Sequence, residues 1–296
     1  MTIDNLGKHN KKQSYANTRT TGKEQYYTTP GVVDICLDYL SSFINLENSR
    51  LLEPAGGTGE FIEGLKRRGI PETNIESYDI EPKHPNVKEA DYLSLTLEFD
   101  DYVSISNPPF GRASSLAKKF FNHAAEHSKF ICYLVPKAWR KWSVQNSLDP
   151  RFHLIGEIEL PKDCFYLPDS RKGKGNVLST IFQIWEKREE PRQKIKIPDY
   201  GLLRKIKPID GKVIGANFEM IVFGYSCGKC AEVTEQIIDC KTTTMYFYIE
   251  REDVKEALRN LDLSKYSKNV SYVQALSIQE INYELNKIFS LPNTTS

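Results

Sequence analysis

The chain lacks several features that would assign it to a common class of protein. No run of about 18 apolar residues occurs, so no transmembrane helix is expected, and the amino terminus has no apolar signal-peptide core. The 40 Lys and Arg residues are balanced by 39 Asp and Glu residues, which leaves a formal net charge of +1. Any affinity for nucleic acid must therefore come from local patches of charge and not from the field of the whole protein.

Cysteine is also scarce. The chain has 6 cysteines in 296 residues, and Cys36 and Cys132 lie within apolar segments. Such cysteines favour reduced thiols, so we expect a cytoplasmic protein. Apolar residues make up 40% of the chain and charged residues 27%, which is typical of a soluble globular protein with a real core. The length allows one large α/β domain and a smaller second one.

The most informative stretch is Asn107-Pro108-Pro109-Phe110, which follows the apolar run 102–106. Two consecutive prolines cannot donate backbone hydrogen bonds and have a fixed φ, so a buried strand must end here in a rigid turn. The Asn107 side-chain oxygen and the Pro108 carbonyl can accept the two hydrogens of an amine on a flat heterocycle. Phe110 can stack on the same ring.

These residue types suit a reaction at such an amine. The lone pair of an aniline-like amine is delocalised into the ring, which makes the nitrogen a poor nucleophile. Two acceptors that draw its hydrogens out of the plane favour a nucleophilic geometry as charge develops, so they stabilise the transition state. The four residues alone are equally compatible with an ordinary proline-rich turn, and other segments must distinguish the two interpretations.

A glycine-rich loop comes earlier in the chain. Residues 50–53 predict a short strand, residues 56–59 (Gly-Gly-Thr-Gly) a tight turn, and the apolar spacing from Phe61 onward a helix that stops at Gly69. A glycine loop between a strand and a helix is the usual nucleotide-binding corner of an open α/β sheet, where the backbone approaches its ligand closely. The loop lacks the Gly-Lys-Ser/Thr of phosphate-binding loops, so ATP or GTP chemistry is not expected.

Two acidic residues follow at positions that suit a nucleoside. Asp79 lies near the end of a predicted strand (75–80), about 20 residues after the glycine loop, where an acid binds a ribose diol. Asp91 follows a weaker strand and could accept a hydrogen bond from an adenine amino group. A solvated loop aspartate is the alternative for Asp91 alone. The ordered set of loop, two acids and Asn-Pro-Pro-Phe is much harder to attribute to chance.

Residues 26–188 resemble the class I S-adenosylmethionine-dependent methyltransferases, and most of all those that methylate the N6 amine of adenine in DNA or RNA. The resemblance implies a Rossmann-like, doubly wound, mostly parallel sheet of seven strands. It also implies the cofactor S-adenosyl-L-methionine, with the glycine loop at its methionine part, Asp79 at its ribose and Asp91 at its adenine. The cofactor-binding residues implied in this way are Thr29, Pro30, Glu53, Pro54, Ala55, Gly56, Gly57, Gly59, Asp79, Ile80, Asp91, Tyr92 and Asn107.

The family's catalytic motif, usually written Asp/Asn-Pro-Pro-Tyr/Phe/Trp, matches Asn107, Pro108, Pro109 and Phe110. The resemblance implies direct methyl transfer from the sulfonium to the amine, with no covalent enzyme intermediate and no metal. An adenine inside a duplex cannot be reached, so a DNA substrate must flip its base out. The order of the motifs resembles the γ arrangement of DNA methyltransferases, whose target-recognition part is C-terminal, and a role in restriction–modification would fit this group.

Candidate substrate-binding residues are aromatic or basic. In the family an aromatic residue packs against the flipped base, which indicates Phe165 or its neighbour Tyr166, although either ring could instead close the core. Trp139 and Trp142 alternate with cations in a helical stretch that could form a nucleic-acid surface, although tryptophans near a helix more often pack in the core. The substrate-binding candidates are Phe110, Phe165, Tyr166, Arg140 and, in a basic loop, Lys172.

The chain divides into three parts by composition. Residues 1–25 are expected to form a disordered polar arm, residues 26–190 the catalytic domain, and residues 191–296 a C-terminal α+β module for target recognition or an accessory role. In the module, strands are expected near 220–223 and 245–249 and helices at 253–261 and 278–289, the last with a capping box from Ser277 to Glu280. The three cysteines of the module lack a fourth ligand, so a closed zinc site is not expected there.

The opening of this module is strongly basic, whereas the rest of it is close to charge-balanced. Contacts to phosphate are therefore expected to be concentrated at this opening and on Arg171, Lys172 and Lys174 of the basic loop, unless the module only covers an edge of the sheet. The cations of the opening are Arg192, Lys194, Lys196, Arg204, Lys205 and Lys207.

The preferred prediction is a DNA adenine-N6 methyltransferase, and other functions remain open. An RNA methyltransferase acting on adenine N6 or guanine N2 is the first alternative. A protein glutamine methyltransferase is less favoured, because Phe110 stands where that group usually has Tyr. A non-catalytic binding subunit is disfavoured by the intact Asp79, Asp91 and Asn-Pro-Pro-Phe motif.

Overall fold

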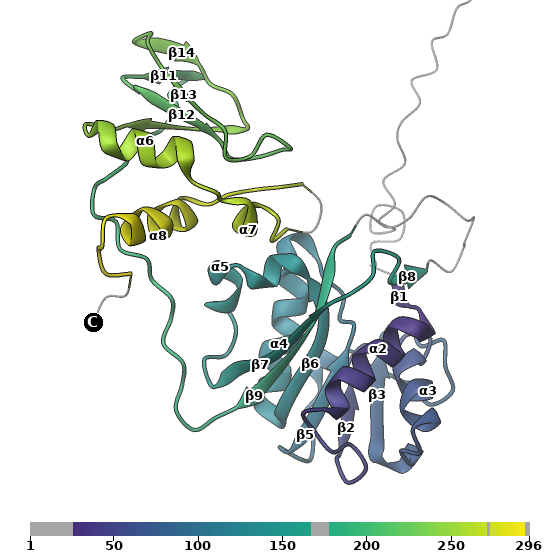
Figure 1. Ribbon diagram of the computed structural model, residues 1–296. Coiled ribbons are helices and arrows are strands. Elements are labelled where there is room, and N and C mark those ends of the chain that lie inside the picture. Colours follow the sequence, from purple (N-terminus) through teal and green to yellow (C-terminus); the bar gives the residue numbers. More distant parts are fainter. Residues whose placement is uncertain (1–25, 167–177, 271–272, 294–296) are drawn as a thin grey trace, which may run out of the picture.

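The computed structural model describes residues 26–166, 178–270 and 273–293. A large α/β unit carries a smaller α+β module at one end (Figure 1). The arm 1–25 and the basic loop with Lys172 lie outside the described residues. No described helix has both the length and the apolar character that a membrane crossing needs.

The α/β unit is built on a 7-stranded sheet with the order β4-β3-β2-β5-β6-β9-β7. Within it β9 runs antiparallel to both of its neighbours, and the remaining pairs are parallel. This arrangement confirms the predicted fold class. The strands are β2 (Leu51–Glu53), β3 (Ile75–Asp79), β4 (Lys88–Glu89), β5 (Tyr102–Ser106), β6 (Ser128–Pro136), β7 (Phe152–Glu159) and β9 (Thr180–Lys187).

The strand order reverses in the middle of this sheet. From β2 the chain moves outward to β3 and β4 and then returns to β5 on the other side of β2. In open α/β sheets, ligands bind outside the carboxyl ends of the strands at such a switch point. The loop after β2 begins with Pro54 and the loop after β5 with Asn107, so both predicted motifs lie at this point.

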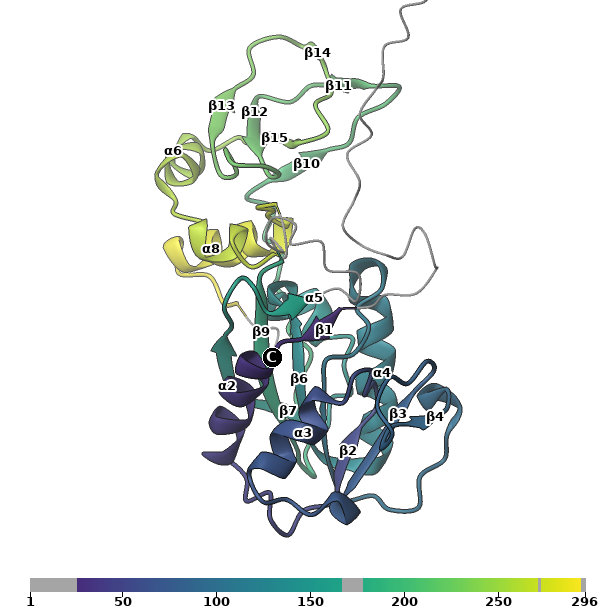
Figure 2. The same cartoon turned by 90° about the vertical axis from the view of Figure 1, so that its right-hand side faces the viewer.

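Helices cover both faces of the sheet. Helices α2 (Pro30–Ser41) and α3 (Glu60–Arg67) lie on one face and α4 (Ser115–His127) on the other (Figures 1 and 2). Pro30 suits the first helical position because its missing N–H has no helical partner there. A side chain at Gly64 would come within 2.6 Å of Val33, so the close packing of α2 on α3 requires glycine.

Large aromatic side chains fill the core beside α4. The Phe121 ring lies 5.9 Å from that of Trp139 and 5.6 Å from those of Phe152 and Trp185. Trp139 has 0% of its surface exposed, so it belongs to the core and not to a nucleic-acid surface. It follows β6 in a single turn, η4 (Lys137–Arg140), which directs the indole inward.

A second, very small sheet lies outside the main one. Strand β1 (Tyr27–Thr28) pairs antiparallel with β8 (Phe165–Tyr166), residues that are far apart in the sequence. A further backbone bond joins the Thr29 N–H to the Cys164 carbonyl at 2.9 Å. The chain entering α2 is therefore fastened to the segment between β7 and β9.

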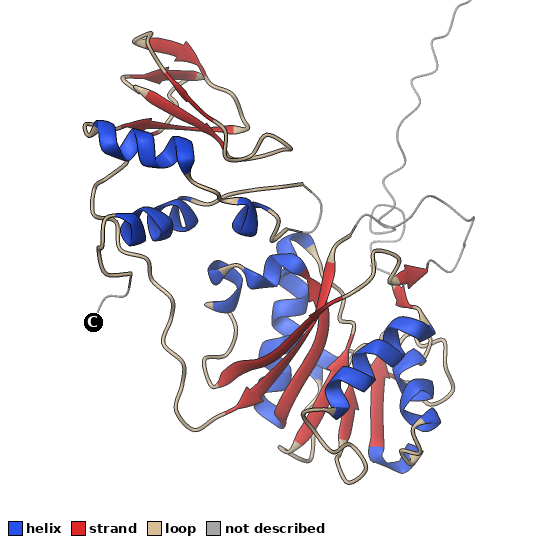
Figure 3. Cartoon of the chain, viewed as in Figure 1, coloured by secondary structure: helices blue, strands red, loops and turns tan. Residues whose placement is uncertain are grey.

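The C-terminal module has a sheet with the order β10-β15-β12-β13 and a separate pair β11-β14. Strands and helices are segregated in it (Figure 3). The predicted capping box is confirmed: the Glu280 N–H donates to the Ser277 hydroxyl and the Ser277 N–H to the Glu280 carboxylate. The elements are β10 (Arg204–Ile206), β11 (Lys212–Ile214), β12 (Phe218–Ile221), β13 (Cys230–Glu232), β14 (Ile237–Asp239), β15 (Thr244–Tyr248), α6 (Glu252–Asn260), α7 (Ser264–Ser267) and α8 (Ile278–Ile288).

The segment between the two parts packs on the α/β unit before it leaves for the module. The guanidinium of Arg192 donates to the carbonyls of Phe152 (2.9 Å), Leu148 (3.1 Å) and Gln145. Three residues later, the backbone of Ile195 exchanges two hydrogen bonds with the side chain of Asn146. The stretch from residue 191, which was expected to belong to the C-terminal module, therefore packs on the α/β unit as far as residue 195.

Candidate active site

A cavity of about 370 Å³ lies at the switch point of the sheet. Its volume is in the range of small-molecule sites, roughly 300–1,000 Å³. The structure brings most of the predicted cofactor and catalytic residues to its wall. These are Glu53, Pro54, Ala55, Gly56, Gly57, Asp79, Ile80, Asp91, Tyr92, Asn107, Pro108, Pro109 and Phe110.

The glycine loop needs its glycines for steric reasons. The Gly56 N–H donates to the Tyr78 carbonyl at 2.9 Å, and a side chain at Gly56 would come within 2.2 Å of the Ser77 hydroxyl. Gly59 has φ +77°, a left-handed conformation that L residues rarely adopt, and it begins α3. Gly59 does not line the cavity; it shapes the turn that does.

Asp79 holds the loop and the strand end together. One oxygen of its carboxylate accepts from the Gly57 N–H at 2.9 Å, and the other accepts from the Glu81 N–H at 2.8 Å. A carboxylate has about four lone-pair positions, so two acceptor positions remain for hydroxyl groups of a ligand. Asp79 is half-buried at the cavity wall, which suits that use.

Glu53 is a buried acid at the cavity wall. It has 3% of its surface exposed and accepts a hydrogen bond from the Ser77 hydroxyl at 3.0 Å. Burial raises the pKa of Glu53 to about 8, because desolvation disfavours the charged carboxylate; the negative charge of Asp79 acts in the same direction. Glu53 is thus mostly neutral at pH 7, and a cation placed beside it would favour its ionised form.

Asp91 and Tyr92 form the next part of the wall. Asp91 is exposed and accepts from the Leu93 N–H at 3.1 Å, which caps the short turn η2 (Tyr92–Ser94). The Tyr92 side chain is buried, with its ring 5.4 Å from that of Phe120 and 4.8 Å from that of His123. The cap positions Asp91, and the aromatic contacts anchor the turn on α4.

Asn107 is oriented by the N-terminal segment. Its side-chain amide donates to the Tyr26 carbonyl at 2.8 Å, which uses the nitrogen and leaves the side-chain oxygen as an acceptor. The rigid turn continues through Pro108 and Pro109 to Phe110, whose side chain is 6% exposed and lines the cavity.

The backbone directly after Phe110 is strained. Gly111 (φ +67°), Ala113 (φ +52°) and Ser114 (φ +57°) all have left-handed conformations. For a residue with a side chain this costs roughly 1–2 kcal/mol. The Leu116 N–H donates to the Phe110 carbonyl at 3.1 Å, which ties α4 to the motif. Such strain persists where the surroundings hold the turn, and it clusters at functional sites.

Phe165 and Tyr166 support the cavity from outside. The Phe165 ring lies 5.7 Å from that of Tyr26 and 6.2 Å from that of Phe110. The Tyr166 hydroxyl is hydrogen-bonded to the Glu60 carboxylate, to which it donates (3.1 Å), and to the Thr58 hydroxyl (3.0 Å), and both partners line the cavity. Neither ring lines the described cavity itself.

Other predicted residues lie elsewhere. Thr29 and Pro30 begin α2 and do not line the cavity. Arg140 is a predicted substrate-binding residue, but its guanidinium is bound by Glu157 at 2.6 Å and Glu159 at 2.8 Å, which leaves it little capacity for phosphate.

Several wall residues were not among those predicted from the sequence. For Tyr26 and Tyr27, the sequence offered one signal: two adjacent aromatic residues shortly before Thr29-Pro30. The additional residues are Tyr26, Tyr27, Thr28, Thr58, Glu60, Phe61, Glu81, Ala90, Leu93, Leu116 and Phe120.

The described residues around the cavity are acidic. Its wall contains five carboxylic acids, Glu53, Glu60, Asp79, Glu81 and Asp91, and among the described lining residues there is no Lys, Arg, His or Cys. Such a site attracts a cation and repels phosphate. The described wall also offers no cysteine or histidine for covalent or proton-transfer catalysis.

Comparisons with known proteins gave matches in fold. No protein-family model matches the chain, and no curated protein does. A candidate RNA methyltransferase from Pyrococcus horikoshii matches with a TM-score of 0.44 and 18% identity, over 55% of this chain and 87% of that chain. The M protein of the type I restriction enzyme EcoKI matches with a TM-score of 0.43 and 15% identity, over 57% and 46%. The 23S rRNA methyltransferase ErmE matches with a TM-score of 0.39 and 15% identity, over 56% and 71%.

Proposed function

We propose that this chain is an S-adenosylmethionine-dependent methyltransferase that methylates the N6 amine of adenine in DNA, by direct transfer to a flipped-out base. One observation carries the proposal: the Asn107–Phe110 turn and an acidic nucleoside-sized cavity meet at the switch point of an α/β sheet. The turn supplies acceptors for an amine, and the cavity suits a cationic nucleoside.

The residues of the cavity fit this cofactor and disfavour the common alternatives. ATP and NAD carry phosphate groups, which need cations or backbone donors, and the described wall is acidic. S-adenosylmethionine has no phosphate and carries a sulfonium and an ammonium. Glu53 would hold the ammonium, Asp79 the ribose hydroxyls and Asp91 the adenine amino group.

Asn107 and Pro108 would act on the target amine. When bound, the cofactor supplies an electrophilic methyl group on a positively charged sulfur. The Asn107 oxygen and the Pro108 carbonyl accept the two N–H hydrogens, so the nitrogen lone pair turns toward the methyl carbon. As the N–C bond formed, the bond between the methyl carbon and the sulfonium would break and leave its electron pair on sulfur as a neutral thioether. The nitrogen would then release its extra proton to solvent. Phe110 stacks on the base and holds the amine in line.

Other substrates with an amine on a planar group fit the same acceptors. RNA adenine N6 and guanine N2 present such amines on nucleobases, and a glutamine side chain presents one on a small amide. The aromatic ring of Phe110 at the cavity favours a base over a glutamine. The intact set of Glu53, Asp79 and Asn107 favours an enzyme over a non-catalytic subunit.

The test is a methylation assay with a choice of polymers. The purified protein is incubated with methyl-labelled cofactor and, separately, with duplex DNA, single-stranded DNA, RNA and a protein extract. The labelled polymer is then digested and the modified unit identified by mass. N6-methyladenine in DNA is expected. Label found only in RNA or only in protein would reject the DNA substrate in favour of an RNA or a protein methyltransferase. The Asn107→Ala protein, purified in the same way, is the control for contaminating enzymes.

A further inference from the structure

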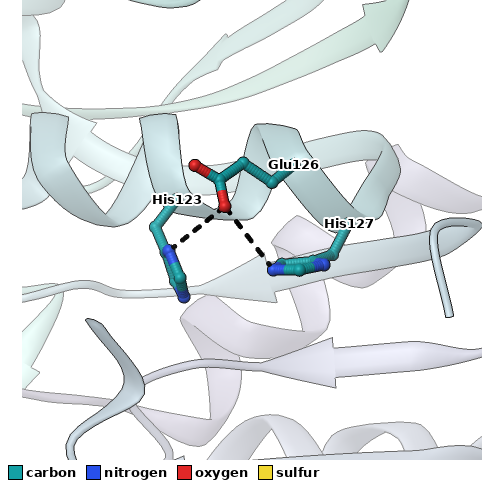
Figure 4. A group of neighbouring side chains, drawn as sticks. All are labelled: His123, Glu126 and His127. Carbon is teal, nitrogen blue, oxygen red and sulfur yellow. Dashed lines mark ion pairs between the residues drawn. The ribbon is translucent and has the colours of Figure 1, made fainter. Parts of the chain in front are cut away.

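Three potential metal ligands gather on the last turn of α4. His123, Glu126 and His127 have the spacing His-x-x-Glu-His, and the ligand atoms of the three lie within 4.8 Å of one another (Figure 4). They lie at the end of α4 opposite Phe110, outside the cavity. They have no part in the proposed methyl transfer.

The distances within this group are not those of ordinary hydrogen bonds. Nδ1 of His123 lies 3.8 Å and Nε2 of His127 3.9 Å from the same oxygen of Glu126. Hydrogen bonds between nitrogen and oxygen are normally 2.7–3.2 Å long. Two ligands bound at about 2.0–2.2 Å to one ion are separated by roughly 3–3.5 Å. Both nitrogen–oxygen distances are therefore too long for direct hydrogen bonds, and the three ligand atoms, which lie within 4.8 Å of one another, would draw together around a shared ion.

The orientation of His123 favours a metal. Its Nε2 lies 3.1 Å from the Leu95 carbonyl, which can only accept, so Nε2 carries the proton and Nδ1 presents its lone pair to Glu126. A metal-ligating histidine typically donates its other ring N–H to a carbonyl or carboxylate in this way.

His127 provides an independent observation. Its Nε2 is buried and has no hydrogen-bond partner among the described residues. Buried polar atoms usually have a partner, and this nitrogen, beside a carboxylate and a second imidazole, is available to a bound group. In Figure 4 both rings present a nitrogen to the same Glu126 oxygen.

We propose that His123, Glu126 and His127 bind a divalent transition metal, zinc being the class that fits best. Two imidazoles and one carboxylate are ligands that zinc prefers, whereas calcium and magnesium require oxygen ligands. The Glu126 side chain is 62% exposed, so water can complete the coordination.

The consequence is structural. His123 already bonds to Leu95 and contacts Tyr92. Tyr92 is the first residue of the η2 turn and Leu95 follows it, and both Tyr92 and Leu93 of this turn line the cavity. A metal on Nδ1 fixes the proton on Nε2 and strengthens the bond to Leu95. The ion would thus fasten the end of α4 to the wall of the cavity.

The experiment titrates untagged, chelator-treated full-length protein with Co²⁺ and records visible absorption, and with Zn²⁺ by calorimetry. About one equivalent of Co²⁺ should bind with the weak bands of a nitrogen and oxygen site. His123→Gln, Glu126→Gln and His127→Gln should each reduce affinity at least tenfold. The matched control His153→Gln, a histidine that lies 2.9 Å from the Glu190 carbonyl outside the group, should bind like the parent.

A second readout separates this site from the cysteines of the module. Thiolate ligands give Co²⁺ an intense near-ultraviolet band, which a site with nitrogen and oxygen ligands lacks. The Co²⁺ spectrum of a Cys227→Ser, Cys230→Ser double variant should therefore equal that of the parent. Zn²⁺ should raise the unfolding temperature of the parent and of His153→Gln, but not of the site variants. Absence of binding, binding that survives His123→Gln with His127→Gln, or a thiolate spectrum would each overturn the proposal. None of these measurements depends on methyl transfer.

Discussion

The side-chain amide of Asn107 donates to the backbone carbonyl of Tyr26, 2.8 Å away and 81 residues earlier in the chain. This bond determines which end of the amide is free to accept. The Tyr26 carbonyl belongs to the segment that β1 and β8 fasten over the cavity, so the orientation of Asn107 depends on residues from three separate parts of the chain. The proposed acceptor is thus organised before any substrate binds.

Replacing Asn107 should affect turnover more than cofactor binding. In Asn107→Ala the amine loses one of two acceptors that act in the transition state, so kcat should fall by roughly a hundredfold or more, as for the removal of a donor from an oxyanion hole. Asn107→Asp keeps an acceptor but cannot donate to Tyr26, and should retain intermediate activity. Single-turnover rates and calorimetric cofactor affinities separate the two effects. Near-normal kcat in a folded Asn107→Ala protein would refute the positioning mechanism.

Stability should depend on pH through Glu53. Its pKa is raised from 4.5 to about 8 in the folded protein, so the folded state binds the proton more tightly than the unfolded state. The stabilisation is complete below pH 4.5 and is lost as the pH rises toward 8, by about 1.4 kcal/mol per pH unit. Glu53→Gln does not titrate and should show no such decrease. Urea unfolding should show the stability of the variant rising relative to that of the parent between about pH 4.5 and pH 8.

The exposed Glu256→Gln protein is the control and should follow the parent at every pH. Cofactor binding gives a second check, because a ligand ammonium beside Glu53 favours the ionised carboxylate. Cofactor affinity should rise with pH up to about 8, with release of a proton. An affinity that does not change over this range would contradict the assignment of Glu53 to the ammonium.

Tyr166 should influence cofactor affinity without touching the cavity. Tyr166→Phe removes hydrogen bonds to Thr58 and Glu60 of the wall. A typical hydrogen bond contributes about 0.5–1.5 kcal/mol, so the cofactor Kd should rise by roughly two- to tenfold. Calorimetry measures it, with Tyr225→Phe as the matched control, since that side chain is 96% exposed. Equal Kd values for the two variants would mean that the Tyr166 bonds do not shape the site.

The sequence predicts most of the α/β unit because its signals are local. Pro30 after Thr29, the apolar run that became β5 and the capping box at Ser277 each involve neighbours in the chain. The small β1-β8 sheet was missed because two-residue strands have no periodicity, and their pairing joins positions more than 130 residues apart, as the register of Tyr27 with Tyr166 shows. Four strands of the module were not predicted for a related reason, since each is only 3 residues long.

The site residues could be predicted where a sequence motif fixes the backbone. They could not be predicted where tertiary packing determines which way a side chain points. The glycine loop, Asp79 and the Asn107–Phe110 turn follow strand ends, which the sheet brings together. Arg140 and Trp139 also follow a strand, β6. Arg140, however, forms ion pairs with Glu157 and Glu159, and Trp139 is buried in the aromatic core. A sequence does not reveal which cation has a partner. The His123 group was not singled out from the sequence. The orientation of the His123 ring depends on its contact with Leu95, a residue of another segment.

A basic segment leads into the C-terminal module. Arg192 is one of its predicted phosphate-binding cations, but its guanidinium is occupied by backbone carbonyls of the α/β unit. Exposed cations remain on either side of residue 200. They are Lys194, Lys196, Arg204, Lys205 and Lys207. The competing interpretation is that the module only braces the α/β unit, through contacts such as the ion pair of Lys141 with Glu280 at 3.0 Å and the packing of Trp142 on Tyr283.

Neutralising Lys194, Lys196, Arg204 and Lys205 together should distinguish the two roles. If these side chains bind phosphate, affinity for all DNA sequences should weaken, and the slope of log K against log salt should decrease by about 0.9 for each phosphate no longer neutralised, because each neutralised phosphate releases condensed counterions. Stability should change little, since exposed cations contribute little to it. The charge-matched control neutralises Arg251, Lys255, Arg259 and Lys287, which are paired with carboxylates. The salt slope of the Lys194 variant could stay unchanged, or it could decrease equally in this variant and in the control. Either result would mean that the module only supports the α/β unit and that DNA binds to the loops around the cavity.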